Sequence, residues 1–131
     1  MGRVAIVGAG AVGLVLAEAA ARAGHHTTLC GERAPDRITV LHRGRVRSTT
    51  VASCRIAARA APVDVVVLAV KRGDDGVAAE WSGLIGTETV VLHARNGLGV
   101  ESGLSPAVNI PSVVNFGAER IAAGVVLRSS G

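Results

Sequence analysis

Short apolar runs alternate with amphipathic segments along the chain. Four runs, rich in apolar and β-branched residues, are typical of strands buried in a sheet; they are residues 3–7, 27–30, 63–70 and 88–93. Residues 14–23 and 74–84 lie between such runs and predict helices. Strands that alternate with helices in this way predict an α/β fold, in which a doubly wound, mostly parallel sheet carries helices on both faces.

Other segments predict shorter strands. Residues 37–41 and 45–51 alternate around His42-Arg43-Gly44, which indicates a hairpin with outward-facing polar side chains. Residues 113–116 predict another strand, and residues 124–127 begin one more. A final strand at the very end of a chain would be an unpaired edge. We therefore expect the sequence to be a piece of a longer protein rather than a stand-alone cofactor-binding domain.

Composition indicates one domain over residues 1–131. Hydrophobic residues make up 49% of the chain, and its aromatic residues are Trp81 and Phe116. No apolar run approaches the roughly 18 residues that span a bilayer, and no secretory signal is visible. Cys30 and Cys54 are too few for a disulfide framework or a metal site. We expect a cytoplasmic protein that has no metal and no membrane contact.

The net charge of +4 comes mainly from arginine, which supplies 13 of the 14 basic residues. Seven arginines fall between Arg33 and Arg59. A nucleic-acid surface is one interpretation of this bias. However, the sequence has no recognition-helix pattern and almost no aromatic residues for base stacking. We expect a basic rim near a phosphorylated cofactor, with no nucleic acid as partner.

A glycine motif follows the first predicted strand directly. Gly8, Gly10 and Gly13 have the spacing G-x-G-x-x-G, with a strand before them and a helix after them. The first glycine permits a tight turn, the second lets the backbone approach a pyrophosphate, and the third lets the helix pack on the strand. The helix start offers free N–H groups to phosphates. In this context the motif predicts a Rossmann-type dinucleotide site.

Polar residues also follow later strands, at the sheet edge where ligands bind in open α/β sheets. Lys71 ends the run of residues 63–70 and could neutralise phosphate or polarise a carbonyl group. Asn96, followed by Gly97 and Gly99, could hydrogen-bond a nicotinamide ribose and a substrate oxygen. Two plainer interpretations stay open. Lys71 could be an exposed strand cap, and Asn96-Gly97 could be an ordinary turn.

These motifs together resemble the ketopantoate reductase family. They are Gly8-Ala9-Gly10-Ala11-Val12-Gly13, Leu68-Ala69-Val70-Lys71, Asn96-Gly97-Leu98-Gly99, and Gly117-Ala118 before Gly124-Val125-Val126. The family's N-terminal domain would cover the whole chain. The resemblance implies an NADP-dependent reduction of a 2-keto acid, with ketopantoate in pantothenate biosynthesis as the default substrate.

The resemblance also implies roles for individual residues. Residues Gly8 to Gly13 would carry the diphosphate, while Lys71, Asn96 and the Ala118 backbone would line the cofactor. Asn96 would also touch substrate. In this family the lysine that acts as general acid lies on a helical C-terminal domain, which is absent from this chain. No catalytic residue is therefore assigned here, and Lys71 is not given that role.

The choice of cofactor depends on the end of the second predicted strand. Sites for NAD or FAD usually carry an acidic side chain there, but this chain has Gly31, followed by Glu32 and Arg33. Arg33 can bind a 2′-phosphate, so NADP is expected in preference to NAD. Glu32 could serve a ribose instead, or it could pair with Arg33 at the surface.

Two other functional classes remain open from the sequence. The first 30 residues fit a flavin monooxygenase almost as well, although such enzymes are expected to have glutamate where this chain has Gly31. A non-enzymatic module that senses NAD(H) or ATP would use the same glycine turn. The sequence does not predict the oligomeric state.

Overall fold

The computed structural model describes residues 2–70, 75–94, 108–112 and 116–129. Six strands form the main sheet in the order β5-β2-β1-β6-β7-β8, and every neighbouring pair is parallel. They are β1 (Arg3–Val7), β2 (His26–Cys30), β5 (Ala52–Cys54), β6 (Val63–Leu68), β7 (Ile85–Ala94) and β8 (Val108–Ser112). The chain extends from β1 first to one side and then to the other, so the predicted doubly wound sheet is confirmed.

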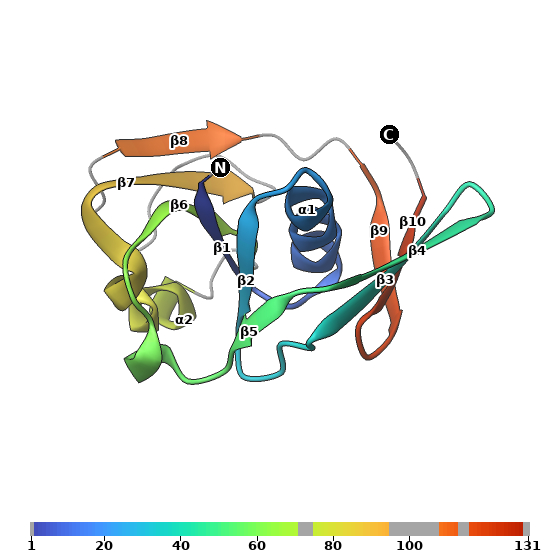
Figure 1. Cartoon of the computed structure of the whole chain (residues 1–131), viewed down its shortest axis with the longest axis horizontal. Coiled ribbons are helices and arrows are strands. Elements are labelled where there is room, and N and C mark those ends of the chain that lie inside the picture. The colour runs from blue at the N-terminus through green and yellow to red at the C-terminus, as the bar shows by residue number, and fades with distance from the viewer. Residues whose placement is uncertain (1, 71–74, 95–107, 113–115, 130–131) are drawn as a thin grey trace.

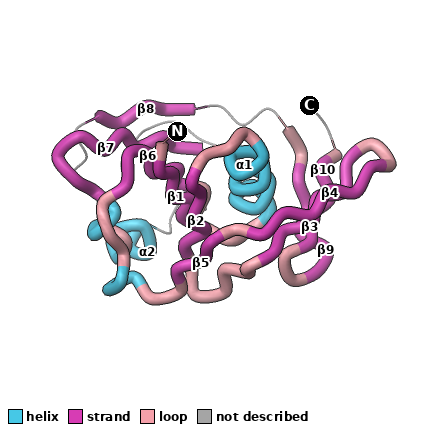
Figure 2. Tube along the Cα trace, viewed as in Figure 1, coloured by secondary structure: helices cyan, strands magenta, loops and turns pink. Residues whose placement is uncertain are grey.

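Alternating side chains of β1 build a core on each face of this sheet. Val4 and Ile6 pack with Leu14 of α1 (Ala11–Arg22), whereas Ala5 and Val7 belong to the core cluster on the opposite face. That second face is covered by α2 (Asp75–Glu80) and two 3-10 turns, η1 (Ala57–Arg59) and η2 (Ser82–Leu84). Figure 2 shows these helical segments on the far side of the main sheet from α1. Helices on both faces are therefore confirmed.

The helix boundaries differ slightly from the prediction. Helix α1 begins three residues before Leu14 because Gly10 is its N-cap and the last part of the glycine motif forms its first turn. The second predicted helix is short, because α2 ends at Glu80 and Trp81 separates it from η2. These two short pieces still place Trp81 and Leu84, which are 3% exposed, against the main sheet.

A second sheet packs on the outer side of α1, so that this helix lies between two sheets (Figure 1). Its strand order is β4-β3-β10-β9. The strands are β3 (Arg37–His42), β4 (Arg45–Thr50), β9 (Ala118–Ala122) and β10 (Val125–Arg128). Ile38, Val40 and Val126 of this sheet complete the core around Leu14 and Val15.

The second sheet confirms the predicted hairpin and corrects the expectation about the last strand. Strand β10 is not an unpaired edge, because it pairs with β3 in parallel and with β9 antiparallel. Residues 52–54, for which no strand was expected, form β5 at the edge of the main sheet. Residues 113–115 of the predicted strand 113–116 lie outside the described residues, and Phe116 lies in a bend. The strand that the structure describes in this region is β8, which precedes the predicted range.

Candidate functional site

The turn after β1 is held between the two strands that flank β1. The Gly8 N–H donates to the Cys30 carbonyl oxygen at 3.0 Å, and the Ala69 N–H donates to the Val7 carbonyl oxygen at 2.8 Å. Gly8 has φ +115°, and a Cβ there would lie 2.9 Å from the Ala69 carbonyl carbon. Because other residues avoid this backbone conformation and have no space there, glycine is required at this turn.

The other two glycines of the motif have different surroundings. A Cβ on Gly13 would overlap the Gly8 carbonyl oxygen, which confirms that Gly13 allows close packing of helix and strand. A Cβ on Gly10 would have no atom within 4 Å, so Gly10 faces open space. That space, beside the start of a helix, is what a pyrophosphate would need.

The start of α1 has backbone N–H groups that could bind an anion. The first intrahelical bond runs from the Leu14 N–H to the Gly10 carbonyl oxygen at 3.0 Å, so the N–H groups of Ala11, Val12 and Gly13 precede it. The first turn carries no acidic residue, and Gly10 makes no side-chain cap. The positive end of the helix dipole is therefore not compensated by the helix's own side chains.

A cavity of about 800 Å³ opens at this turn, beside the carboxyl ends of β1 and β2. Six of the predicted site residues line it: Gly8, Ala9, Gly10, Ala11, Arg33 and Ala118. Val12 and Gly13 lie in α1 behind them and contribute to the helix start rather than to the lining. Lys71 and Asn96, with Gly97 and Gly99, lie outside the described residues. The volume lies in the range usual for ligand sites, about 300–1,000 Å³.

The cavity also contains residues that sequence reasoning missed. Arg55 follows β5, Arg120 lies on β9, and Trp81 follows α2. Each comes from an element whose position is set by long-range strand pairing or packing, so no local motif signals it. Among the described residues, Arg33, Arg55 and Arg120 line the cavity, and Glu32, Glu80 and Glu119 balance their charge.

Glu32 and Arg33 occupy the middle of a β-turn after β2. The Ala34 N–H donates to the Gly31 carbonyl oxygen at 3.1 Å, which closes the turn, and both side chains are exposed at the cavity. Among the residues that the structure describes, the ion pairs are Glu18–Arg22 and Asp36–Arg55. The pairing of Glu32 with Arg33 that the sequence left open is thus not formed, and both charges face the cavity independently.

Arg55 is fixed beside the cavity by backbone and side-chain contacts. Its Nε donates to the Ala34 carbonyl oxygen at 2.8 Å, and its guanidinium lies 3.4 Å from the Asp36 carboxylate. The pKa of Asp36 is lowered, first because the Ser53 hydroxyl donates to its carboxylate and then because Arg55 is near. Asp36 therefore stays ionised and ties the end of β5 to the start of β3.

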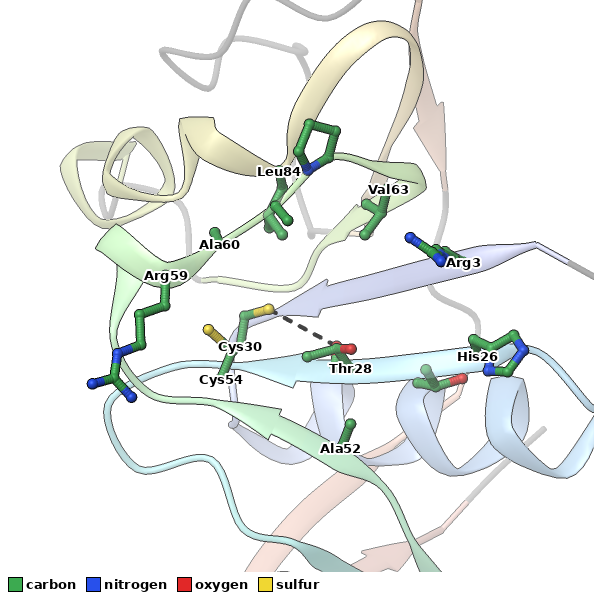
Figure 3. A pocket seen from close by; sticks show the side chains of 13 residues that line it. Arg3, His26, Thr28, Cys30, Ala52, Cys54, Arg59, Ala60, Val63 and Leu84 are labelled. Atoms are coloured by element: carbon green, nitrogen blue, oxygen red, sulfur yellow. Dashed lines mark hydrogen bonds between the residues drawn. The ribbon is translucent and has the colours of Figure 1, made fainter.

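A second cavity, of about 420 Å³, lies along β5 and β2 on the face opposite α1 (Figure 3). Cys30 and Cys54, which are register partners, both line it, and both are free thiols. Burial, and secondarily the nearby Cys54, raises the pKa of the Cys30 thiol to about 12. Cys30 is therefore a protonated, unreactive thiol at neutral pH.

Within the described residues, no group of three or more His, Cys, Asp or Glu side chains could hold a metal ion. The helices in this part of the chain are also too short or too polar to cross a membrane.

The doubly wound sheet and the glycine turn after its first strand are those of a Rossmann-type α/β domain. The family model for ketopantoate reductase PanE/ApbA matches residues 4–131, and the chain belongs to this family. No curated protein matches the sequence.

Solved structures agree with this assignment. A dimeric ketopantoate reductase from Staphylococcus aureus is 27% identical with a TM-score of 0.77, and the match covers 95% of this chain and 47% of that one. A PanE/ApbA family ketopantoate reductase from Ralstonia eutropha JMP134 is 25% identical with a TM-score of 0.79, over 95% and 45% of the two chains. This chain therefore spans about half the length of these proteins.

More distant structures share the fold. A putative ketopantoate reductase from Ralstonia solanacearum MolK2 is 24% identical with a TM-score of 0.82, over 100% of this chain and 50% of that one. A D-mandelate dehydrogenase, solved with NADH and anilino(oxo)acetate, is 20% identical with a TM-score of 0.76, over 95% and 44% of the two chains.

Proposed function

We propose that this chain is the NADP(H)-binding domain of an oxidoreductase that reduces a 2-keto acid. The observation that carries the proposal is the cavity where the Gly8–Ala11 backbone meets Arg33, Arg55 and Arg120. Membership of the ketopantoate reductase family supports ketopantoate as substrate. A role in pantothenate biosynthesis and a cytoplasmic location are parts of the same proposal.

Each part of the cavity suits one part of a dinucleotide. The diphosphate would lie over Gly10 and receive hydrogen bonds from the N–H groups at the start of α1. The adenosine would lie toward the turn after β2, where Arg33 would meet the 2′-phosphate and Arg55 would add positive charge. Ala118 would line the cofactor with its backbone. Lys71 and Asn96 keep their proposed roles at the ends of their strands, with Asn96 also touching substrate.

The reaction needs a hydride and a proton. The bound dinucleotide would supply the hydride to the keto carbon, and a general acid would protonate the carbonyl oxygen to give the 2-hydroxy acid. We assign that acid to a helical C-terminal domain, following the family pattern, and not to Lys71. The 131-residue chain alone should then bind the cofactor without turning substrate over.

Trp81 provides a direct test of cofactor binding, because it is the only tryptophan in the sequence and lines the cavity. NADPH should quench its fluorescence with a saturable dependence on concentration. Gly10→Val should abolish this signal while the variant still unfolds cooperatively, because a side chain there would enter the pyrophosphate space. Gly76→Val is the matched control, since Gly76 also faces open space but lies on α2, away from the lining.

Four results would contradict the proposal. Equal NADPH affinity in wild type and Gly10→Val would place the dinucleotide elsewhere. Flavin absorbance in the purified protein would favour the monooxygenase alternative. Binding of ATP with no binding of NADPH would favour a nucleotide-sensing module. Robust NADPH oxidation with ketopantoate by the isolated chain would show that the catalytic acid is misplaced.

A further inference from the structure

A third cavity, of about 410 Å³, lies between the second half of α1 and the β3–β4 hairpin. We call it the basic pocket. It is lined by five arginines and one acid: Arg22, Arg43, Arg45, Arg47, Arg128 and Glu18, together with His42, Val15 and Val40. It shares no lining residue with the proposed cofactor cavity and lies toward the opposite end of α1.

Strand register brings these cations together. Arg45 pairs with His42, and His42 pairs with Arg128, so the three residues form one row across β4, β3 and β10. Register partners project on the same face of a sheet. Arg47 pairs with Val40 in a neighbouring row, two residues from Arg45 and thus about 7 Å away on the same face. The hairpin brings His42 and Arg45 together, and the pairing of β10 with β3 adds Arg128 from a distant part of the sequence.

Helix α1 supplies the opposite wall of the basic pocket. Val15 and Val40 are 3% and 5% exposed and form an apolar floor. Glu18 is also buried, and its carboxylate receives a bond from the Arg22 Nε at 3.1 Å. Because the single acid is already paired with Arg22, it compensates only that arginine. Arg43, Arg45 and Arg47 have no acidic partner among the described pocket residues.

Contacts within the pocket restrict two of its side chains. The His42 Nδ1–H donates to the Arg128 carbonyl oxygen at 3.1 Å, because a carbonyl oxygen can only accept. The Arg128 guanidinium stacks on the Phe116 ring, 5.0 Å from its centroid. These contacts restrict the side chains of His42 and Arg128 before any ligand arrives, which lowers the entropic cost of ordering these two on binding.

Arg43 adds a backbone feature. It has φ +50° at the hairpin turn before Gly44, a conformation that asparagine, aspartate or glycine normally adopts. An arginine there is strained, and strained residues concentrate at functional sites.

We propose that the basic pocket binds a small polyphosphate anion. Guanidinium groups donate in a planar fork that matches phosphate oxygens, and the three uncompensated arginines, Arg43, Arg45 and Arg47, suit a ligand with several negative charges. A volume of about 410 Å³ holds a compact anion rather than a folded partner. The ligand also relieves the repulsion between like charges in adjacent rows of the sheet.

The test is titration calorimetry with inorganic tripolyphosphate. Because the glycine turn could also bind phosphates, the titration uses the Gly10→Val variant and, in parallel, wild type saturated with NADPH. Saturable binding is expected in both. Sodium sulfate at equal ionic strength should not reproduce it.

Two matched double variants locate the site. Arg45→Gln with Arg47→Gln should weaken binding about tenfold or more. Arg37→Gln with Arg59→Gln removes the same charge from exposed positions outside the basic pocket and should leave binding unchanged. Glu18→Gln should tighten binding several-fold, because it removes the only carboxylate and releases Arg22 toward the anion.

Three outcomes would overturn the proposal. An equal loss of tripolyphosphate affinity in the two double variants would mean that the anion is held by the overall positive charge and not by the basic pocket. Complete competition by NADPH would mean that the anion occupies the cofactor cavity. Tighter binding of an oligoglutamate peptide than of tripolyphosphate would identify the basic pocket as a surface for an acidic protein.

Discussion

The Gly8 carbonyl oxygen occupies the position that a methyl group on Gly13 would need. This contact sets the separation of β1 and α1, and it determines where the helix start meets the cavity. Gly10, between them in sequence, has no such neighbour within 4 Å. The motif therefore contains one glycine, Gly13, that helix packing requires, and one, Gly10, whose missing side chain leaves open space beside the helix start.

The first prediction separates these two roles. Gly13→Ala should lower the free energy of unfolding by about 3 kcal/mol, because the backbone must shift to relieve the overlap. Gly10→Ala should leave stability nearly unchanged while weakening NADPH binding. Denaturant unfolding and Trp81 fluorescence titration measure the two effects. A stable Gly13→Ala variant would mean that α1 can move away from β1 at little cost.

The second prediction concerns the turn after β2. If Arg33 meets the 2′-phosphate, Arg33→Ala should weaken NADPH binding by about 1.5–3 kcal/mol, roughly ten- to a hundred-fold, and barely affect NADH. Glu32→Ala should act in the opposite direction, since it removes a charge that repels the phosphate and a possible ribose acceptor. Both cofactors are titrated into wild type and the two variants. Preference of wild type for NADH, with loss of affinity in Glu32→Ala, would identify an NAD-using protein.

The third prediction uses Gly31 to change the cofactor. A Cβ there would lie 3.7 Å from the Ala9 Cβ, an ordinary contact, so a side chain is sterically acceptable. Gly31→Asp should shift preference from NADPH toward NADH, because a carboxylate at this strand end accepts bonds from the ribose hydroxyls and repels a 2′-phosphate. Gly31→Asn is the matched control without the charge. An unchanged ratio of affinities in Gly31→Asp would place the adenosine away from this turn.

The fourth prediction follows from the raised pKa of Cys30, about 12 in the folded protein against 9.0 for an ordinary thiol. At pH values between these two pKa values, the Cys30 thiol loses its proton in the unfolded chain and keeps it in the folded chain. Stability should therefore fall as pH rises from about 9 to 12, by up to about 1.4 kcal/mol per pH unit. Urea unfolding across this range measures the slope, and Cys30→Ala should remove the corresponding part of it.

Iodoacetamide labelling provides an independent check on this thiol. In a Cys54→Ser variant, Cys30 should react only at the rate of unfolding, because it is fully buried and protonated. Rapid labelling under native conditions would show that the second cavity opens to solvent and that the thiol is accessible.

The local pattern of the sequence was sufficient for four of the six strands of the main sheet, β1, β2, β6 and β7, but not for β5 or β8. The strand before Gly8, the glycine turn and α1 form a contiguous unit, so their periodicity and spacing predict both structure and chemistry. The apolar run at residues 63–70, of which residues 63–68 form β6, and the hairpin of β3 and β4 were predicted for the same reason. The family resemblance, carried by short motifs, was confirmed by the match over residues 4–131.

Only the tertiary structure decided how distant segments pair. Strand β10 lies between β3 and β9, and His42 meets Arg128 across 86 residues of sequence. Strand β5 has only three residues and no apolar run, yet its pairing with β2 brings Arg55 to the cavity. Such pairings depend on which surfaces remain to be buried after the local elements form, and that information is not local. The sequence therefore determined the glycine turn, whereas tertiary packing determined which arginines surround it and which gather in the basic pocket.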